Sequence, residues 1–287
     1  DNFKFDELEY SELIFSGLFQ NNKFTINHLL GKNEESKLEL SGLLDLNHKF
    51  LLSEDSEVDL KGNIQSFDIS KLNRYTPWTI DISGKATSDI SISGKLNNIK
   101  LDLNPTISDP VFDKIKGVEA FGKISYKNNR IYFSNTTCQT ALGRYDINGS
   151  LPVNLNYFNN EEIDFKPIYI DIVGASESIE LLTPYFPFIK EVNGDFDYTL
   201  NIHGNYNKTI RDGQITIRDA YMDILQLDNR ISNINAYAVV NNNRLIINDF
   251  NAELSKPMES EDLINEIAFS VKEAFDYNDP DIGTISI

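Results

Sequence analysis

The chain has 287 residues, of which 40% are hydrophobic and 11% aromatic, so it has enough apolar material for a core and is not expected to be disordered. It carries 44 acidic and 26 basic residues, a net charge of −18, and such a surface repels the phosphates of nucleic acids and of anionic lipids. Nucleic-acid binding is therefore not expected, and any patch that meets anionic headgroups must be local. Cys138 is the single cysteine, which excludes an intramolecular disulfide and predicts a small buried side chain.

Three segments, 18–26, 124–133 and 238–247, share the form of a tight hairpin. Each has an apolar strand, an Asn pair, a basic residue and a second strand. Asn tolerates the positive φ that two-residue hairpin turns need. The sequence therefore predicts turns at Asn21–Asn22, at Asn128–Asn129 and within 241–243.

Between these hairpins, apolar and polar residues alternate with a period of two, and turn residues recur every ~8–12 positions. This period is typical of strands with one apolar face and one wet face. The sequence predicts a mostly β fold of many antiparallel strands. The clearest apolar positions are Ile80, Ile82, Ile90, Ile92, Leu101, Leu103, Ile168, Ile170, Ile172, Phe196, Tyr198, Leu200, Ile202, Ile215 and Ile217.

Helical signals are scarce. In 109–117, Asp109 suits a helix cap, Pro110 the first helical position and Gly117 the exit, which predicts a short helix. Residues 260–275 place apolar side chains on one face at helical spacing, which predicts an amphipathic helix. This helix is interpreted either as a cap on the end of a sheet or as a lid or membrane-surface element, and its acidic residues argue against anionic lipid surfaces.

An internal repeat of about 110 residues is indicated by matching turn residues. Thr76–Pro77, Gly84 and Gly94 are echoed by Thr183–Pro184, Gly194 and Gly204. Repeats of this kind stack into an extended body. The predicted division is a partial N-terminal β repeat at 1–60, β-groove repeats at 61–165 and 166–258, and the amphipathic helix with the start of further strands at 259–287. Aromatic residues at 75–78 and 185–189 occupy matching places and either plug the joint between repeats or line a constriction.

The segments 82–85, 92–100, 145–151, 198–205, 213–220 and 235–248 share a pattern of strand, Gly, strand and small loop. This pattern resembles the AsmA/TamB-like family of bacterial envelope proteins, over about 60–287. The resemblance implies an elongated, twisted antiparallel β-groove with an apolar lumen, a few short helices and a place in the periplasm. It also implies an inner-membrane anchor outside this chain, which begins at Asp1 without a leader and is expected to be a fragment. Family members are implicated in phospholipid transfer between membranes and in outer-membrane protein assembly.

We therefore expect a non-enzymatic segment that conducts phospholipid acyl chains, with no catalytic residue, cofactor or metal. The alternative is an interaction module that pairs an edge strand with client strands, with an Omp85-type outer-membrane β-barrel assembly protein as a partner. A closed β-sandwich from an adhesin is a third reading, and an enzyme a distant fourth. The expected lipid-lining residues are Ile80, Ile82, Ile90, Ile92, Leu101, Leu103, Phe196, Tyr198, Leu200, Ile202, Ile215 and Ile217.

Overall fold

The computed structural model describes residues 3–5, 8–33, 35–47, 49, 51–71, 82–155, 162–225, 227 and 229–254. The chain is mostly β. Strands β3 to β18 belong to one antiparallel sheet of 16 strands, and β1 and β2 form a separate two-stranded sheet. Helix in the described part is limited to short 3₁₀ segments, which confirms the predicted fold class of many antiparallel strands with few short helices. None of the described helices has the length and hydrophobicity needed to cross a membrane.

The chain divides into two compact units. Unit 1 comprises Asp1–Gln139, Ile147–Ile168 and Asn205–Asn207, and unit 2 comprises Thr140–Asp146, Tyr169–Gly204 and Lys208–Ile287. The strands that lie wholly or largely in unit 1 are β1 (Phe3–Phe5), β2 (Leu8–Tyr10), β3 (Glu12–Gln20), β4 (Lys23–Lys32), β5 (Lys37–Asp45), β6 (Glu57–Asp68), β7 (Ile82–Lys95), β8 (Asn98–Leu103), β9 (Thr106–Phe112), β10 (Ile115–Lys116), β11 (Glu119–Tyr126), β12 (Arg130–Gln139) and β13 (Arg144–Pro152). Those of unit 2 are β14 (Ile168–Ser178), β15 (Ile189–Gly204), β16 (Thr209–Ile224), β17 (Ile231–Asn241) and β18 (Arg244–Leu254), together with the 3₁₀ helix η2 (Ile179–Tyr185).

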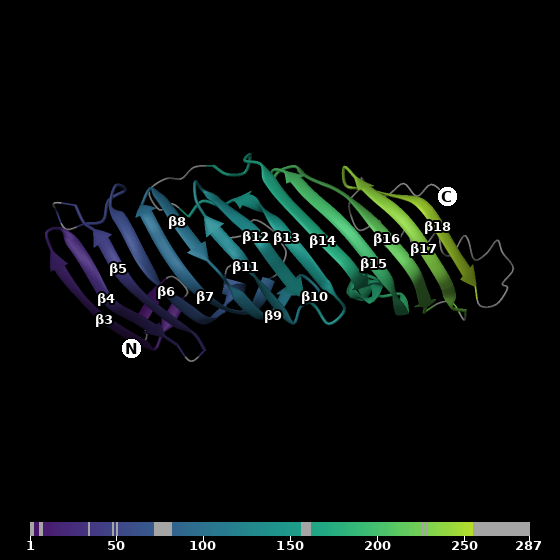
Figure 1. Cartoon of the computed structure of the whole chain (residues 1–287), viewed down its shortest axis with the longest axis horizontal. Helices are drawn as coiled ribbons and strands as arrows, with labels where there is room; N and C mark the ends of the chain where they lie inside the picture. The colour runs from purple at the N-terminus through teal and green to yellow at the C-terminus, as the bar shows by residue number, and fades with distance from the viewer. Residues whose placement is uncertain are drawn as a thin grey trace. The chain divides into compact units, whose positions relative to one another are not determined.

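Within each unit, most strands that follow one another in the chain lie side by side in the sheet, and β8 to β10 are the exception (Figure 1). In unit 1 the order runs from β3 through β8 and then to β11 and beyond, and β9 continues β8 by pairing with both β7 and β11. In unit 2 the order is β14 to β18. Tight turns make this order easy to form where the connections are short, as between β3 and β4 and between β17 and β18, because antiparallel strands can be joined by two-residue hairpins.

The three predicted hairpins are confirmed. They join β3 to β4, β11 to β12 and β17 to β18, with Gln20 opposite Lys23, Tyr126 opposite Ile131 and Asn241 opposite Arg244. In each turn, two successive Asn residues have φ between 50° and 66°. Positive φ at both central positions matches the right-handed twist of the flanking strands, and Asn adopts it at small cost.

Most long strands are interrupted by a bulge. The register shifts between Ser83 and Lys85 on β7 and between Asn193 and Asp195 on β15, at glycines with φ of 138° and 146°. On the neighbouring strands, Asp109 and Asp219 both have φ of 48°. A bulge bends its strand and increases the local twist, so these positions curve each strand along its length.

The predicted short helix at 109–117 is wrong, because these residues form the end of β9, a turn and β10. Val111 lies opposite Ser83 of β7, and the backbone N–H of Gly117 donates to the carbonyl of Pro110 at 2.7 Å. The Asp–Pro–Gly signals that suit a helix end also suit a bulge and a turn, since Pro is accepted at bulges and Asp at positive φ. Residues of β9 pair with β7 and β11, and this pairing favours the strand and turn over the helix. The predicted helix at 260–275 lies outside the described residues.

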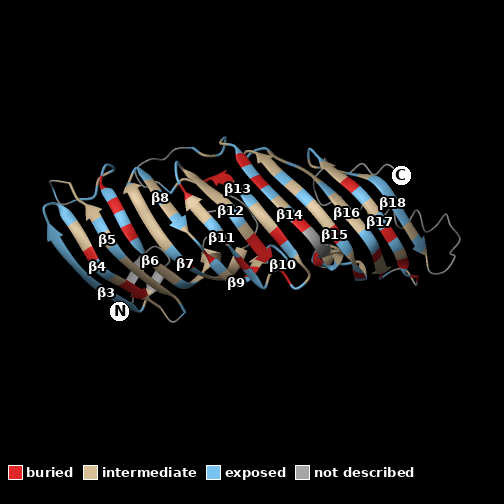
Figure 2. Cartoon of the chain, in the orientation of Figure 1, coloured by how far each residue is buried: buried red, intermediate tan, exposed pale blue. Residues whose placement is uncertain are grey.

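Each unit has a small buried cluster. In unit 1, Ile26, Val58 and Leu60 are buried, and half-buried residues of β4, β5, β7 and the β7–β8 turn pack against them. In unit 2, Ala220, Ile224, Ile231 and Ile234 are buried beneath Ile179 of η2 and Phe188. Figure 2 shows that buried residues form short stripes on the strands, separated by longer half-buried and exposed stretches. Of the two aromatic segments, the one at 185–189 thus contributes Phe188 to a core, and the one at 75–78 lies outside the described residues.

Candidate functional site

The candidate site is an apolar sheet face that each unit presents. In an antiparallel sheet, residues directly opposite one another lie on the same face. In unit 1, Ile90 is opposite Leu103, and Ile92 is opposite Leu101. The pairing continues on both sides, so two rows of apolar side chains cross the strands. The first row is Phe15, Leu29, Leu40, Ile90, Leu103, Ile124 and Phe133, and the second is Ile26, Leu60, Ile92, Leu101, Tyr126 and Ile131.

Unit 2 has the same arrangement. Phe196 is opposite Ile217, Tyr198 is opposite Ile215, and Leu200 is opposite Gly213. The rows extend over β17 and β18 as Ala236 and Phe250, Ala238 and Ile247, and Val240 and Leu245. The rings of Phe196 and Tyr198 stack with centroids 5.1 Å apart, and Phe196 is buried.

The opposite face of each unit is mainly polar. In unit 1, Asp59, Ser93 and Lys100 form one row. In unit 2, Thr199 lies opposite Gln214, and Asp197 forms an ion pair with Arg218. The sheet of each unit is therefore amphipathic across its thickness, as the period-two alternation predicts.

Most of the residues expected to line the site are brought together on the apolar faces. Ile90, Ile92, Leu101 and Leu103 lie together in unit 1, and Phe196, Tyr198, Leu200, Ile215 and Ile217 lie together in unit 2, where Ile202 is opposite Arg211 at the end of the face. Ile82 is opposite Phe112 beyond the register shift at Ser83, where simple alternation no longer assigns a face. Ile80 lies outside the described residues.

The structure adds residues that the sequence reading did not select. In unit 1 these are Ile26 and Leu60, which are buried at the centre of the face, and Ile124. Alternation in β4 and β6 is a usable signal for the first two. In unit 2 the most notable addition is Arg211, which continues the alternating series Gly213, Ile215 and Ile217. A cation in an apolar series is easily passed over when only apolar positions are read.

Each apolar face is covered at one end, and elsewhere it combines buried residues, such as Leu60 and Phe196, with half-buried ones. In unit 1, the Tyr10 ring lies against Gly31, beside a small hollow whose other lining residues include Leu38 and Ile64. In unit 2, η2 and Phe188 cover the bulged end of the strands. Residues between, such as Ile92 and Leu200, are half-buried by their neighbours in the same sheet. The described strands form no second large sheet, as a two-layer sandwich would require.

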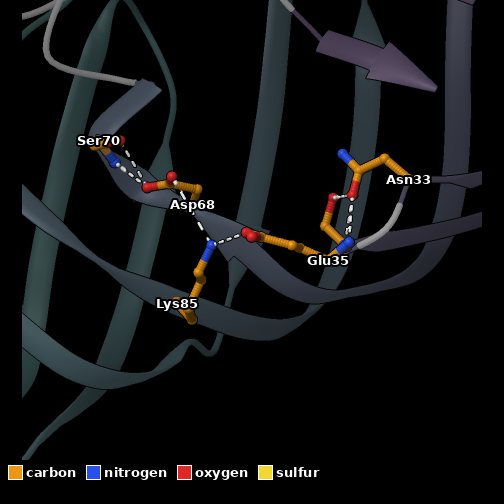
Figure 3. Close-up of polar contacts among 6 residues, drawn as sticks. Asn33, Glu35, Asp68, Ser70 and Lys85 are labelled. Carbon is orange, nitrogen blue, oxygen red and sulfur yellow. Dashed lines mark hydrogen bonds and ion pairs between the residues drawn. The ribbon is translucent and has the colours of Figure 1, made fainter. Parts of the chain in front are cut away.

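A polar network holds one end of unit 1 together (Figure 3). Lys85 on β7 forms ion pairs with Glu35, in the β4–β5 connection, and with Asp68 at 3.9 Å. Asp68 accepts hydrogen bonds from the backbone N–H and the hydroxyl of Ser70 at 3.0 and 2.7 Å. The hydrogen bonds from Ser70 hold the pKa of Asp68 below its usual value, and the hydrogen bond to Glu35 raises the pKa of Lys85. These are exposed groups that position loops, so their contribution to stability is small.

Cys138 and His203 are the two side chains with reactive groups that the sequence drew attention to. Cys138 is buried, as predicted, and lies beside Gly117. His203 lies 3.6 Å from Asp212 on the polar side of β15. Within the described ranges, no group of three or more His, Cys, Asp or Glu residues is arranged to hold a metal ion. What the faces offer is apolar surface.

Comparison of the chain with protein-family models, with curated proteins and with solved structures gave no match.

Proposed function

We propose that the chain is a segment of a periplasm-spanning AsmA/TamB-like protein, and that its apolar faces conduct phospholipid between the inner and outer membranes. The supporting observation is the set of apolar rows that cross the strands on one side of each unit. A sheet with one apolar face must cover that face with something. Acyl chains are a suitable cover, since burying each CH₂ group contributes about 0.8 kcal/mol.

The spacing of the strands suits an acyl chain. Neighbouring strands lie about 4.8 Å apart. One membrane leaflet contributes about 15 Å of hydrocarbon, half of the ~30 Å core of a bilayer. An acyl chain laid along a row therefore covers about three strands, and the rows of unit 1 cross more strands than that. Lipid can then pass along a row without a fixed, deep pocket.

Leu200→Asp is the sharpest test of this proposal. Leu200 is a half-buried member of the apolar face that lies outside the buried clusters, whereas Ile92 packs against Ile26, Val58 and Leu60. A charge at position 200 opposes acyl binding because the carboxylate loses its hydration. We expect native mass spectrometry, with lipid extraction from the same sample, to find phospholipid on the wild-type chain and about tenfold less on the variant, equivalent to roughly 1.4 kcal/mol.

The matched control is Thr199→Asp, which places the same charge on the exposed polar face of the same strand. It should retain wild-type lipid, and circular dichroism should show both variants folded. Ile92→Asp is expected to lose lipid as well, with some loss of stability. A lipid-free, compact wild-type chain would contradict conduction. Unfolding of Leu200→Asp would indicate that this face is a closed core.

A second candidate is strand pairing with client proteins during outer-membrane protein assembly, and β3 favours it. Among the described strands, β3 is hydrogen-bonded to β4 alone. It exposes Leu13, Ile14, Phe15 and Leu18, the last to 57%, with no Lys or Pro to block pairing. Exposed apolar edges of this kind template the addition of a strand. Photo-crosslinking groups at Leu18 and at Leu200 separate the two functions, because crosslinks to protein concentrated at Leu18 would favour pairing and crosslinks to lipid at Leu200 would favour conduction.

A further inference from the structure

Arg211 is a cation on the apolar face of unit 2. It lies opposite Ile202, and the next pair along the same two strands is Leu200 opposite Gly213. On β16, Ile217, Ile215, Gly213 and Arg211 lie on the same face of the sheet. Arg211 is the last of the four, close to the β15–β16 loop. Arg211 is exposed at the rim of the face. The apolar face begins with the next pair of opposed residues, Leu200 and Gly213.

The charge of Arg211 has no carboxylate partner within the described part of the chain. Its side chain donates to the Oδ1 of Asn243 at 3.3 Å, a neutral amide that also accepts from the Arg211 backbone N–H at 2.9 Å. The adjacent Asp212 is engaged with His203 at 3.6 Å and accepts from the backbone of Asn242 at 2.7 Å. Other arginines in this acidic chain, such as Arg144 and Arg218, are ion-paired.

The fold does not require an arginine at this place. The equivalent pair in unit 1 is Ile92 opposite Leu101, in the same register and 110 residues earlier. Leucine there simply extends the apolar row. Besides its hydrogen bond to Asn243, Arg211 adds a local positive charge beside the apolar row. An anionic headgroup needs such a charge on a surface that is otherwise acidic.

Gly213 provides space beside the guanidinium. It occupies the position between Leu200 and Val240, where unit 1 has Leu103 between Ile90 and Ile124. A Cβ at position 213 would lie 2.1 Å from the backbone oxygen of Thr199. The surface between Leu200 and Val240 therefore carries no side chain. Glycine inside a strand commonly marks a place where a ligand or another backbone approaches closely, and the backbone of Thr199 is the close neighbour of Gly213 within the sheet.

We infer that Arg211 binds the phosphate of a phospholipid whose acyl chains lie over Gly213, Leu200 and Val240. This inference rests on the proposed function and adds a headgroup site to it. Guanidinium groups bind phosphate through paired hydrogen bonds, which fixes orientation as well as charge. The lipid is then held headgroup-outward at the rim of unit 2, and unit 1 has no equivalent cation at Leu101.

The test compares phosphatidylglycerol with diacylglycerol of the same acyl chains, which lacks the phosphate. Both are offered to the full chain, and retention is measured by native mass spectrometry. We expect Arg211→Leu to retain five- to tenfold less phosphatidylglycerol and an unchanged amount of diacylglycerol, and Arg211→Lys to keep part of the preference. Arg244→Leu is the matched control, because Arg244 is opposite Asn241 at the neighbouring hairpin and has no ion pair in the described part of the chain.

Equal retention of phosphatidylglycerol by the wild type and Arg211→Leu would overturn the headgroup site and leave conduction standing, provided that both lipids bind. An equal loss in Arg244→Leu would also overturn it, since the effect would then be one of net charge. Failure of the wild type to retain either lipid would overturn both the proposed function and this inference.

Discussion

In unit 1, β7 pairs with β8 and β9, and in unit 2, β15 pairs with β16. The two sets of pairs have the same register, because each residue of unit 1 corresponds to the residue 110 positions later in unit 2. Ile99 opposite Gly94 corresponds to Thr209 opposite Gly204, and Phe112 opposite Ile82 corresponds to Met222 opposite Val192. The bulges correspond too, since Gly84 and Gly194 both have φ near 140°. We expect these few backbone positions to maintain the common register.

The two regions differ in what fills the apolar face. Phe196 and Tyr198 stack at the centre of unit 2, and the residues in the same places in unit 1 are Ala86 and Ser88. The strand opposite is continuous in unit 2, as β16, and is divided in unit 1 between β8 and β9 at Asn104–Pro105. The same register thus accommodates Phe196 and Tyr198 in unit 2 and Ala86 and Ser88 in unit 1. Aromatic rings therefore cover this part of the face in unit 2, whereas unit 1 has small side chains at the same places.

Phe196→Ala makes unit 2 resemble unit 1 and is expected to have the largest effect. Phe196 is 4% exposed, and its removal leaves a cavity beneath Tyr198. Loss of a buried Phe costs about 3–5 kcal/mol. Hydrogen exchange should report this loss in β15 and β16 but not in β7. The matched control is Phe250→Ala, where the side chain is 56% exposed and the expected loss is below about 1 kcal/mol. Equal effects of the two substitutions would show that the aromatic stack does not stabilise unit 2.

Substitution of the two bulge glycines tests whether they maintain the shared register. In Gly194→Ala, the new Cβ would lie 2.4 Å from the Cα and Cβ of Ala220, in addition to the strain of φ at 146°. In Gly84→Ala, the nearest atom is the side-chain Cγ2 of Ile107 at 2.8 Å, which can move. Positive-φ strain costs about 1–3 kcal/mol in both, and the backbone clash adds to it in unit 2. Urea unfolding should therefore rank Gly194→Ala as the more destabilised variant, and the reverse order would contradict this account.

Local chemistry determined how much of the fold was predictable from the sequence. The hairpin turns were predictable because Asn pairs have few other uses between apolar strands, as Asn128–Asn129 illustrates. Faces within a strand were predictable where no bulge intervenes, as for Ile90 and Ile92. Ile82 was not, because the register shift at Gly84 changes the alternation, and the sequence pattern indicated a turn residue there and not a bulge.

The misread segment 109–117 has a related cause. Asp109, Pro110 and Gly117 satisfy the local rules for a helix and for a bulge followed by a turn. The choice between them depends on β7 and β11, which lie on either side of β9 and whose contribution is not local. For the site, the apolar members were predictable from alternation, but the position of Arg211 became clear only when the pairing placed it opposite Ile202.

The last difference between the two regions lies two residues after the second glycine, and its expected effect is the smallest. Leu96 packs against the buried cluster of unit 1, whereas its counterpart Tyr206 donates to the carbonyl of Pro152 at 2.5 Å. Burial raises the pKa of Tyr206 to about 12, above the value near 10 of an unfolded chain. Because the folded state disfavours the phenolate, the contribution of Tyr206 to stability is intact below pH ~10 and is lost as the pH rises towards 12.

Tyr206→Phe isolates this titration from those of the other tyrosines. At neutral pH the variant should be less stable by about 1 kcal/mol, through loss of one hydrogen bond. Between pH 10 and 12 the wild type should lose stability more steeply, so that the two unfolding curves converge. Thermal unfolding at a series of pH values measures both effects. Parallel curves across this range would contradict the raised pKa, because Tyr206 would then ionise as readily in the folded chain as in the unfolded one, whereas the offset between the curves at neutral pH separately measures the hydrogen bond to Pro152.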